Sequence, residues 1–344
     1  MRILVTGHNG YIGTILTPML LGLGHEVKGL DSNLYDSCFF EQFPPPTIPA
    51  TVKDVRDVEL VDVLGFDTVI HLAGLSNDPL GYFNPELTFE INHLASIRLA
   101  ELCKKAGVKR FLYASSCSNY GAAGDNLISE TGVLNPITPY AVSKMRAEQE
   151  IGKLADDTFS PIFLRNATVY GFSPRIRFDL VINNLVAWAY TTRKIYLKSD
   201  GHSWRPLVHV ADVAQAFVKL MEAPLEVVHN EIFNVGDTRE NYRIADLVEI
   251  IAAIIPDATI EYAEDAGPDK RNYRVNCDKI QRVIPSFKPA WNVEKGVQEL
   301  YQIYQNVHLQ AGIFESATFK RIAHIQQLIR LRKLDGNLRN VVLA

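Results

Sequence analysis

The chain has 344 residues, of which 47% are hydrophobic and 22% are charged, and its formal net charge at pH 7 is −4. These values are typical of a folded globular protein, and the length allows two lobes around one cleft. The weakly acidic balance gives no reason to expect nucleic-acid binding, and the longest apolar stretches are too short to span a membrane.

The cysteines and the first residues of the chain indicate the cellular compartment of the protein. The four cysteines are scattered without CxxC spacing: Cys38, Cys103, Cys117 and Cys277. We interpret them as free thiols in a reducing compartment, with no metal site and no disulfide framework. The chain begins directly with a predicted strand, without the basic and apolar segments of an export signal. We therefore expect a cytoplasmic protein.

The N-terminal segment MRILVTGHNGYIG predicts a strand that runs into a glycine-rich turn before an amphipathic helix. Gly7 permits a tight turn, Gly10 lets backbone N–H groups approach a pyrophosphate, and Gly13 lets the helix pack close to the strand. An ordinary turn can also carry glycines at this spacing. The strand before it and the helix after it favour a dinucleotide-binding loop.

An acidic residue at the end of the next predicted strand indicates which dinucleotide binds. Asp31 lies 18 residues after Gly13 and is followed by Ser32 and Asn33 rather than by a basic residue. A carboxylate there accepts hydrogen bonds from both adenosine ribose hydroxyls but repels a 2′-phosphate. The sequence therefore favours NAD over NADP.

The first half of the chain alternates predicted strands and helices, which indicates an α/β fold with a parallel sheet covered on both faces. After the first strand and helix, the predicted strands lie at 26–30, 51–55, 68–73, 110–115 and 161–165. Predicted helices lie near 85–106 and 139–155. Pro18 falls inside the first helix and should kink it or cost about 3 kcal/mol.

Beyond Gly171 the pattern becomes irregular and predicts a smaller, interleaved lobe. The predicted helices are 179–190, 211–222 and 244–255, and the predicted strands are 195–198, 204–210, 231–235 and 259–262. We expect a dinucleotide-binding domain at 1–172, to which 207–237 returns, and a substrate lobe at 173–307. The basic, helical extension at 308–344 should pack on the body of the protein or on a neighbouring subunit.

A second motif contains the candidate catalytic residues. The segment 115–121 follows a predicted strand, and Tyr140 and Lys144, four residues apart, open a helix on one face. A lysine ammonium and a positive nicotinamide ring should lower the pKa of the phenol. The phenolate then takes a proton from a sugar hydroxyl while that carbon gives its hydride to NAD. YxxxK pairs also arise by chance, but this one follows a nucleotide motif in the right order.

Together these motifs resemble the extended short-chain dehydrogenase/reductases, specifically their NAD-dependent nucleotide-sugar epimerase/dehydratase family, over roughly residues 1–305. The resemblance implies a Rossmann-type, doubly wound parallel sheet, a nucleotide-diphosphate-sugar substrate and bound NAD. It also implies a homodimer formed by the helices at 85–106 and 139–155. It assigns Ser116, Tyr140 and Lys144 as the catalytic residues.

The resemblance also implies which residues contact each ligand. The cofactor-binding residues would be Gly7, Asn9, Gly10, Tyr11, Ile12, Gly13, Asp31, Asn33, Asp54, Val55, Leu72, Ala73, Gly74, Asn92, Tyr140 and Lys144. The substrate-binding residues would be Ser76, Ser116, Cys117, Ser118, Thr168, Asn184, Arg205 and Arg271. Thr168 stands where the family has an asparagine, and the assignment of Asn184 can slip by one residue to Asn183. The segment 269–271 resembles a second phosphate-side segment, and the loops 76–78 and 175–179 should shape the cleft.

One departure from the family bears on the reaction. The 4,6-dehydratases of the family carry Asp-Glu after the catalytic serine or threonine, whereas this chain has Cys117 and Ser118. Without these carboxylates, removal of water is disfavoured. Cys117 is then either a small packing residue or a thiol acid/base, and the second role needs a perturbed pKa.

These observations favour an epimerase that works through a transient keto-sugar, with C4 as the expected position of oxidation. A keto-sugar reductase or a dehydratase of the same family is the alternative. A non-catalytic NAD-binding regulator is a third hypothesis, but it would not need the set Ser116, Tyr140 and Lys144. The nucleotide base, the sugar and the inverted carbon are not identified by the sequence.

Overall fold

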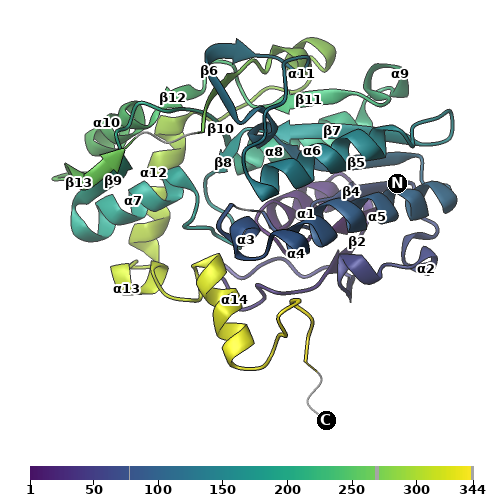
Figure 1. The fold of residues 1–344 in the computed structure, drawn as a ribbon, viewed down its shortest axis with the longest axis horizontal. Helices are drawn as coiled ribbons and strands as arrows, with labels where there is room; N and C mark the ends of the chain where they lie inside the picture. The colour runs from purple at the N-terminus through teal and green to yellow at the C-terminus, as the bar shows by residue number, and fades with distance from the viewer. Residues whose placement is uncertain (77, 268–270, 342–344) are drawn as a thin grey trace.

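The computed structural model describes residues 1–76, 78–267 and 271–341. Its centre is a seven-stranded sheet in the order β11-β7-β5-β4-β1-β2-β3, in which all neighbouring strands are parallel (Figure 1). The strands are β1 (Arg2–Thr6), β2 (Glu26–Asp31), β3 (Ala50–Val52), β4 (Thr68–His71), β5 (Arg110–Ser116), β7 (Ser160–Asn166) and β11 (Ile232–Val235). The predicted doubly wound sheet is confirmed. The strand order reverses between β1 and β4, and ligands of such sheets bind outside the carboxyl ends of the strands at this point.

Helices cover both faces of this sheet. The helical segments of the first half are α1 (Gly13–Gly22), η1 (Val55–Asp57), α2 (Leu60–Val63), α3 (Asp78–Phe83), α4 (Pro85–Phe89), η2 (Glu90–Leu94), α5 (Ala95–Lys105), η3 (Cys117–Tyr120) and α6 (Pro139–Gly152). Helix α1 continues through Pro18, which lies on its exposed side. Thr138 caps α6 by accepting a hydrogen bond from the backbone N–H of Ala141, and proline at the first helical position suits that start.

The helix predicted at 85–106 is interrupted. Asn84 caps its start as expected, since its side chain accepts a hydrogen bond from the backbone N–H of Leu87. Between α4 and α5, however, Glu90–Leu94 form a single π-helical turn. Such turns are rare in proteins, and those that occur are often found at functional sites. This one carries Asn92, whose side chain holds the loop after β4.

The second half builds smaller sheets around the open side of the large one. Its strands are β6 (Ala122–Ile128), β8 (Thr168–Tyr170), β9 (Lys194–Ser199), β10 (Trp204–His209), β12 (Asn241–Arg243), β13 (Thr259–Gly267) and β14 (Asn272–Val275). They pair as β12-β10-β8, β13-β9 and β14-β6. Its helices are α7 (Val181–Thr192), α8 (Val210–Glu222), α9 (Leu225–Val228), α10 (Ile244–Ile254), α11 (Asp278–Val283), α12 (Val293–Asn306), α13 (Ala311–Phe314) and α14 (Arg321–Arg330).

The segment 207–237 crosses between the two sheet systems. Strand β10 pairs with β8 and β12 in the small sheet, whereas α8 packs against α1 and β11 forms the edge of the large sheet beside β7. The return to the large sheet is therefore made by α8 and β11 rather than by the whole segment.

The C-terminal extension packs on its own chain. Phe314 and Phe319 are buried in the apolar core of the smaller lobe, while Ile325 and Leu338 are buried against the large-sheet domain. In Figure 1 the yellow helix α14 lies below the sheet, near α3, and leads to the C-terminus. Within the described part of the chain, no helix is both long and apolar enough to cross a membrane.

Candidate active site

A cavity of about 1200 Å³ opens at the carboxyl ends of the large-sheet strands, between this sheet and the smaller lobe. Nearly all of the residues assigned from the sequence line it. They are Gly7, Asn9, Gly10, Tyr11, Ile12, Gly13, Asp31, Asn33, Asp54, Val55, Leu72, Ala73, Gly74, Ser76, Ser116, Ser118, Tyr140, Lys144, Thr168, Asn184, Arg205 and Arg271. Asn92 and Cys117 do not line this cavity.

The glycine loop lines one end of the cavity, where it packs closely against the segment after β4. Gly7 has φ +74°, and a Cβ at this position would lie 2.6 Å from the backbone N of Ala73. The carboxylate of Asp31 accepts hydrogen bonds from the backbone N–H groups of Asn9, at 3.1 Å, and Asn33, at 2.8 Å. The loop and this carboxylate together fit the diphosphate and adenosine ribose of a dinucleotide.

Lys53 is the cation closest in sequence to this ribose position among the cavity-lining residues. Its ammonium is ion-paired with Asp62 at 2.7 Å and with Glu59 at 3.4 Å. Arg175, whose charge acts on Asp31, is itself ion-paired with Asp36 at 2.9 Å. A 2′-phosphate would therefore meet the Asp31 carboxylate, and the charges of Lys53 and Arg175 are already balanced by carboxylates. The residues at this ribose position therefore fit NAD better than NADP, which carries a 2′-phosphate.

The catalytic candidates come from two elements. Ser116 is the last residue of β5, while Tyr140 and Lys144 lie in the first turns of α6. The hydroxyl of Ser116 accepts hydrogen bonds from the backbone N–H and hydroxyl of Ser118, at 3.1 and 2.8 Å. The ammonium of Lys144 donates to the carbonyl of Ala114 at 2.9 Å. All three side chains thus meet beside the end of β5.

Burial shifts the pKa values of Tyr140 and Lys144 in opposite directions, and in both it favours the neutral form. It raises the pKa of Tyr140, and the Ser116 hydroxyl and the positive charge of Arg177 oppose this rise. It lowers the pKa of Lys144 to about 8. The expectation that Lys144 lowers the pKa of Tyr140 is thus not met in the chain alone. Desolvation outweighs the charges that favour a phenolate there.

Asn92 and Cys117 lie behind the cavity wall. The amide of Asn92 accepts from the backbone N–H of Leu75 and donates to the carbonyl of Leu75, both at 2.8 Å. Asn92 therefore positions the Gly74–Leu75 loop instead of facing a ligand. The thiol of Cys117 donates to the carbonyl of Arg165 at 3.1 Å, and burial raises its pKa far above the ordinary value. Such a thiol packs and does not exchange protons near pH 7.

The smaller lobe supplies the other side of the cavity. Arg205 donates to the carbonyl of Arg271, and Arg271 pairs with Asp78 at 2.8 Å. Of the two neighbouring asparagines on α7, Asn184 lines the cavity. Asn183 is fully buried and accepts from the backbone N–H of Gly171 at 3.0 Å. Asn77, Asp269 and Lys270, which lie in segments assigned from the sequence, are outside the described residues.

Arg177 and Asn166 are among the cavity residues that the sequence motifs did not predict. Arg177 pairs with Asp179 at 2.6 Å and donates to the hydroxyl of Ser76 at 3.0 Å, so it links the two sides of the cavity. Its loop was expected to shape the cleft, but a single arginine carries no motif. Asn166, at the end of β7, also lines the cavity, and its buried Oδ1 has no hydrogen-bond partner among the described residues.

This site agrees with the comparisons with known proteins. A model of the NAD dependent epimerase/dehydratase family matches residues 3–236, and the chain belongs to this family. The predicted family, its NAD dependence and its enzymatic character are thereby confirmed. The match begins at β1 and ends after β11, so it covers the whole large sheet.

Individual relatives are similar over most of the chain. A UDP-glucose 4-epimerase of Neisseria meningitidis serogroup C is 29% identical over 88% of this chain and 95% of its own. UDP-glucuronic acid decarboxylase 1 of Arabidopsis thaliana is 27% identical over 89% of this chain and 70% of its own. The solved structure of MoeE5 in complex with UDP-glucose and NAD is 27% identical, with a TM-score of 0.77 over 90% of this chain and 100% of its own.

Proposed function

We propose that the protein is an NAD-dependent epimerase of nucleotide-diphosphate sugars that acts through a transient keto-sugar, oxidised at C4. The observation that carries this proposal is the meeting of Ser116, Tyr140 and Lys144 in a cavity that also holds the dinucleotide loop. Relatives named as UDP-sugar 4-epimerases support the class of substrate.

The residues divide the work as follows. Tyr140 takes the proton of the sugar hydroxyl, and the Ser116 hydroxyl shares the hydrogen bond with the reacting oxygen. Lys144 places a positive charge beside this pair and stabilises the phenolate. Bound NAD would accept the hydride and return it. Turning the keto-sugar over before the hydride returns inverts the carbon.

The cavity gives little support to the dehydratase alternative. The position after Ser116 is Cys117, a buried thiol with a raised pKa. Asp78 and Asp179 line the cavity, but each is ion-paired with an arginine, at 2.8 and 2.6 Å. Each carboxylate is thus already engaged by a guanidinium instead of a leaving hydroxyl.

A homodimer and a cytoplasmic location belong to the same proposal. The apolar side chains Tyr82, Phe83 and Leu94 are 60%, 42% and 57% exposed on the segment that includes α3 and the π turn. Burying such a surface against a second copy would form a two-fold interface. Four free, buried cysteines are typical of a reducing compartment.

A panel of nucleotide sugars tests the reaction class. The purified protein is incubated with UDP-glucose, UDP-galactose, UDP-glucuronate and UDP-N-acetylglucosamine, and the products are identified by NMR. We expect a C4 epimer from at least one of them. A 4-keto-6-deoxy sugar would support the dehydratase alternative, and a pentose would indicate decarboxylation.

A further inference from the structure

The C-terminal extension contributes to the cavity wall. Residues 308–344 lie beyond the segment that the family model matches, 3–236. Nevertheless five of its side chains line the cavity: Glu315, Lys320, Arg321, Ile322 and Leu338. The extension is therefore part of the site.

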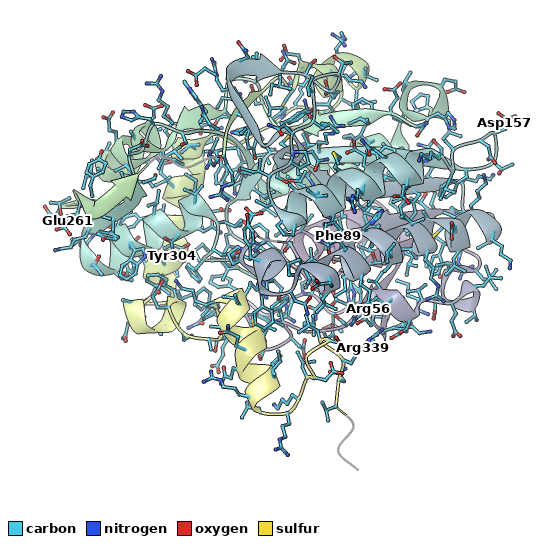
Figure 2. All side chains as sticks on the ribbon, viewed as in Figure 1. Arg56, Phe89, Asp157, Glu261, Tyr304 and Arg339 are labelled. Atoms are coloured by element: carbon cyan, nitrogen blue, oxygen red, sulfur yellow. The ribbon has the colours of Figure 1, made fainter. Side chains whose placement is uncertain are left out.

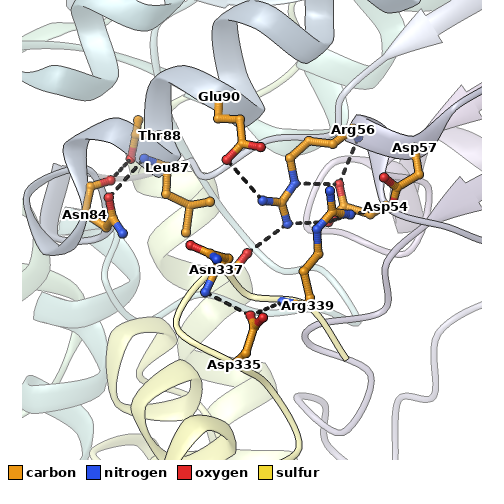
Figure 3. Close-up of polar contacts among 10 residues, drawn as sticks. All are labelled: Asp54, Arg56, Asp57, Asn84, Leu87, Thr88, Glu90, Asp335, Asn337 and Arg339. Atoms are coloured by element: carbon orange, nitrogen blue, oxygen red, sulfur yellow. Dashed lines mark hydrogen bonds and ion pairs between the residues drawn. The ribbon is translucent and has the colours of Figure 1, made fainter. Parts of the chain in front are cut away.

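Polar contacts fasten the end of the extension to the adenosine end of the cavity. Arg339 forms ion pairs with Asp57 and, at 3.2 Å, with Asp54. Arg56 donates to the carbonyl of Asn337 at 2.9 Å. Figure 3 shows Arg56 and Arg339 converging on Asp54, which the resemblance to the family places at the adenine edge of the cofactor. Figure 2 places both arginines at the lower side of the molecule. The extension is thus tied to the segment that should border the adenine.

Apolar side chains of the extension cover the same end. Leu338 is 4% exposed and belongs to one buried cluster with Val55 and Leu30. Ile322 packs against this cluster from α14. Both Ile322 and Leu338 face the cavity. An adenine base in this position would meet apolar atoms instead of water.

Arg321 is a buried cation without a complete set of partners. Its guanidinium lies over the ring of Tyr35, 4.0 Å from the centroid, and Nη2 donates to the carbonyl of Arg175 at 3.2 Å. Nη1 and the hydroxyl of Tyr35 are both buried and have no hydrogen-bond partner among the described residues. Arg321 is only 6% exposed. A buried guanidinium with an N–H group that lacks an acceptor is energetically costly unless a ligand accepts that hydrogen bond.

The neighbouring charges indicate which kind of ligand is missing. Burial lowers the pKa of Arg321 and the positive charge of Arg177 adds to this shift, whereas Tyr35, Cys38 and Asp179 oppose it. Arg177 also acts on Tyr140 and is balanced by Asp179. Arg321 thus lies between the catalytic end of the cavity and the adenosine end. An anion fits this position, and a guanidinium suits phosphate oxygens.

We propose that the extension completes the dinucleotide site, with Arg321 binding a diphosphate oxygen of NAD and with Ile322 and Leu338 covering the adenosine. Two diphosphates enter this cavity if the proposed function holds, that of NAD and that of the nucleotide sugar. The contact with Tyr35, two residues after Asn33 of the ribose loop, assigns Arg321 to NAD. The proposal rests on NAD binding and does not depend on which sugar reaction follows.

Binding measurements on the full-length chain, stripped of nucleotide, test this proposal. NAD, ADP-ribose and UDP are titrated by calorimetry into the parent, Arg321→Met and the matched control Arg330→Met, an exposed residue of the same helix. For Arg321→Met we expect NAD and ADP-ribose to bind about 10- to 100-fold more weakly, as for one lost charged hydrogen bond. UDP and the control should change less than about twofold. Unchanged NAD binding, or a loss confined to UDP, would overturn the assignment.

Two further measurements separate binding from folding. Removing an incompletely paired buried charge should leave the melting temperature of ligand-free Arg321→Met at or above that of the parent. Arg339→Ala, which releases the fastening to Asp54 and Asp57, should speed the release of NAD measured by dilution. Release at the parent's rate would contradict the role of the extension. Because none of these measurements requires turnover, they stay informative if no epimerase activity is found.

Discussion

The proposed proton transfer depends on the half-buried Tyr140 and the buried Lys144, and desolvation disfavours the ionised form of both side chains. Burial raises the pKa of Tyr140 and lowers that of Lys144 to about 8. In the chain alone, the neutral phenol of Tyr140 and the neutral amine of Lys144 are therefore more favoured than they are for the same side chains in water. Because ionisation costs both groups, a phenolate–ammonium pair needs the charge of the bound nicotinamide and the hydrogen bond of Ser116.

Replacing the phenol tests the assigned proton acceptor. Tyr140→Phe should keep the fold and NAD affinity but reduce turnover by about 10³- to 10⁴-fold, since no other group is assigned to take the proton. Steady-state rates and NAD titration measure both effects. Tyr262→Phe, which removes a hydroxyl from a side chain that is 54% exposed and lies outside the cavity lining, is the control and should be neutral. Near-normal turnover of Tyr140→Phe would exclude this mechanism.

The buried lysine predicts a pH dependence of stability. Between the folded pKa of about 8 and the unfolded value near 10.5, the unfolded chain binds one more proton at Lys144 than the folded chain. Stability therefore gains from this group as pH rises through that window, by on the order of 2 kcal/mol. Denaturant unfolding of the ligand-free parent and Lys144→Met at pH 8 and pH 10 measures it. The difference between the two proteins should shift in favour of the parent at pH 10. An equal response of both would contradict the burial argument.

At the scale of elements, a short π turn and a loop set the geometry beside the catalytic pair. Glu90–Leu94 bring Asn92 to the backbone of Leu75. Gly74 precedes that residue, and a Cβ on it would lie 2.9 Å from the Asn92 amide oxygen and 3.7 Å from the Lys144 ammonium. The amide thus holds the loop that borders the lysine and lines the proposed cofactor site.

Asn92→Ala should lower both stability and NAD affinity. It leaves the N–H and C=O of Leu75 without partners in a buried site, at a cost of about 2–4 kcal/mol. Denaturant unfolding and NAD titration measure the two effects. Asn126→Ala, at an exposed position of β6, is the matched control and should stay within about 0.5 kcal/mol of the parent. If both variants behave alike, the loop does not depend on this amide.

The strength of local signals explains which elements the sequence predicts. The buried strands of the large sheet read as apolar runs between turn residues, so their order along the chain and the site at their ends could be predicted. Strand β6, with Gly124 and Asp125 inside an exposed segment, lacks any alternation. The π turn could not be predicted because one inserted residue leaves the helical spacing of apolar residues almost unchanged. Arg177 and Arg321 reach the cavity only through tertiary contacts.

At the scale of the whole molecule, the extension joins the two lobes around the cavity. Phe319 is buried in the core of the smaller lobe, and Leu338 is buried beside Val55 of the large-sheet domain. The basic residues of the extension include Arg321, which lines the cavity, and Arg339, which pairs with Asp54 at the adenosine end. An extension engaged in this way is not free to act as an independent tail.

The proposed dimer makes a prediction about two exposed leucines. Leu94, 57% exposed on the π turn, should be covered by the partner, so Leu94→Glu should convert the protein to a monomer. Leu331→Glu, at a residue 58% exposed in the extension, should leave the dimer intact. Gel filtration with light scattering at micromolar concentration distinguishes the two. A dimer broken by Leu331→Glu alone would place the interface on the extension, and a monomeric parent would remove the proposal.

The central claim, that the sugar carbon is oxidised and then reduced within one cavity, is tested most directly by running the reaction in D₂O. Hydride that leaves the sugar and returns from the cofactor never exchanges with solvent, whereas the proton on Tyr140 does. NMR of the product should show protium retained at the inverted carbon and no net loss of NAD. Deuterium at the inverted carbon would show inversion by proton abstraction, and a dehydrated product would show elimination of water; either result would contradict the account.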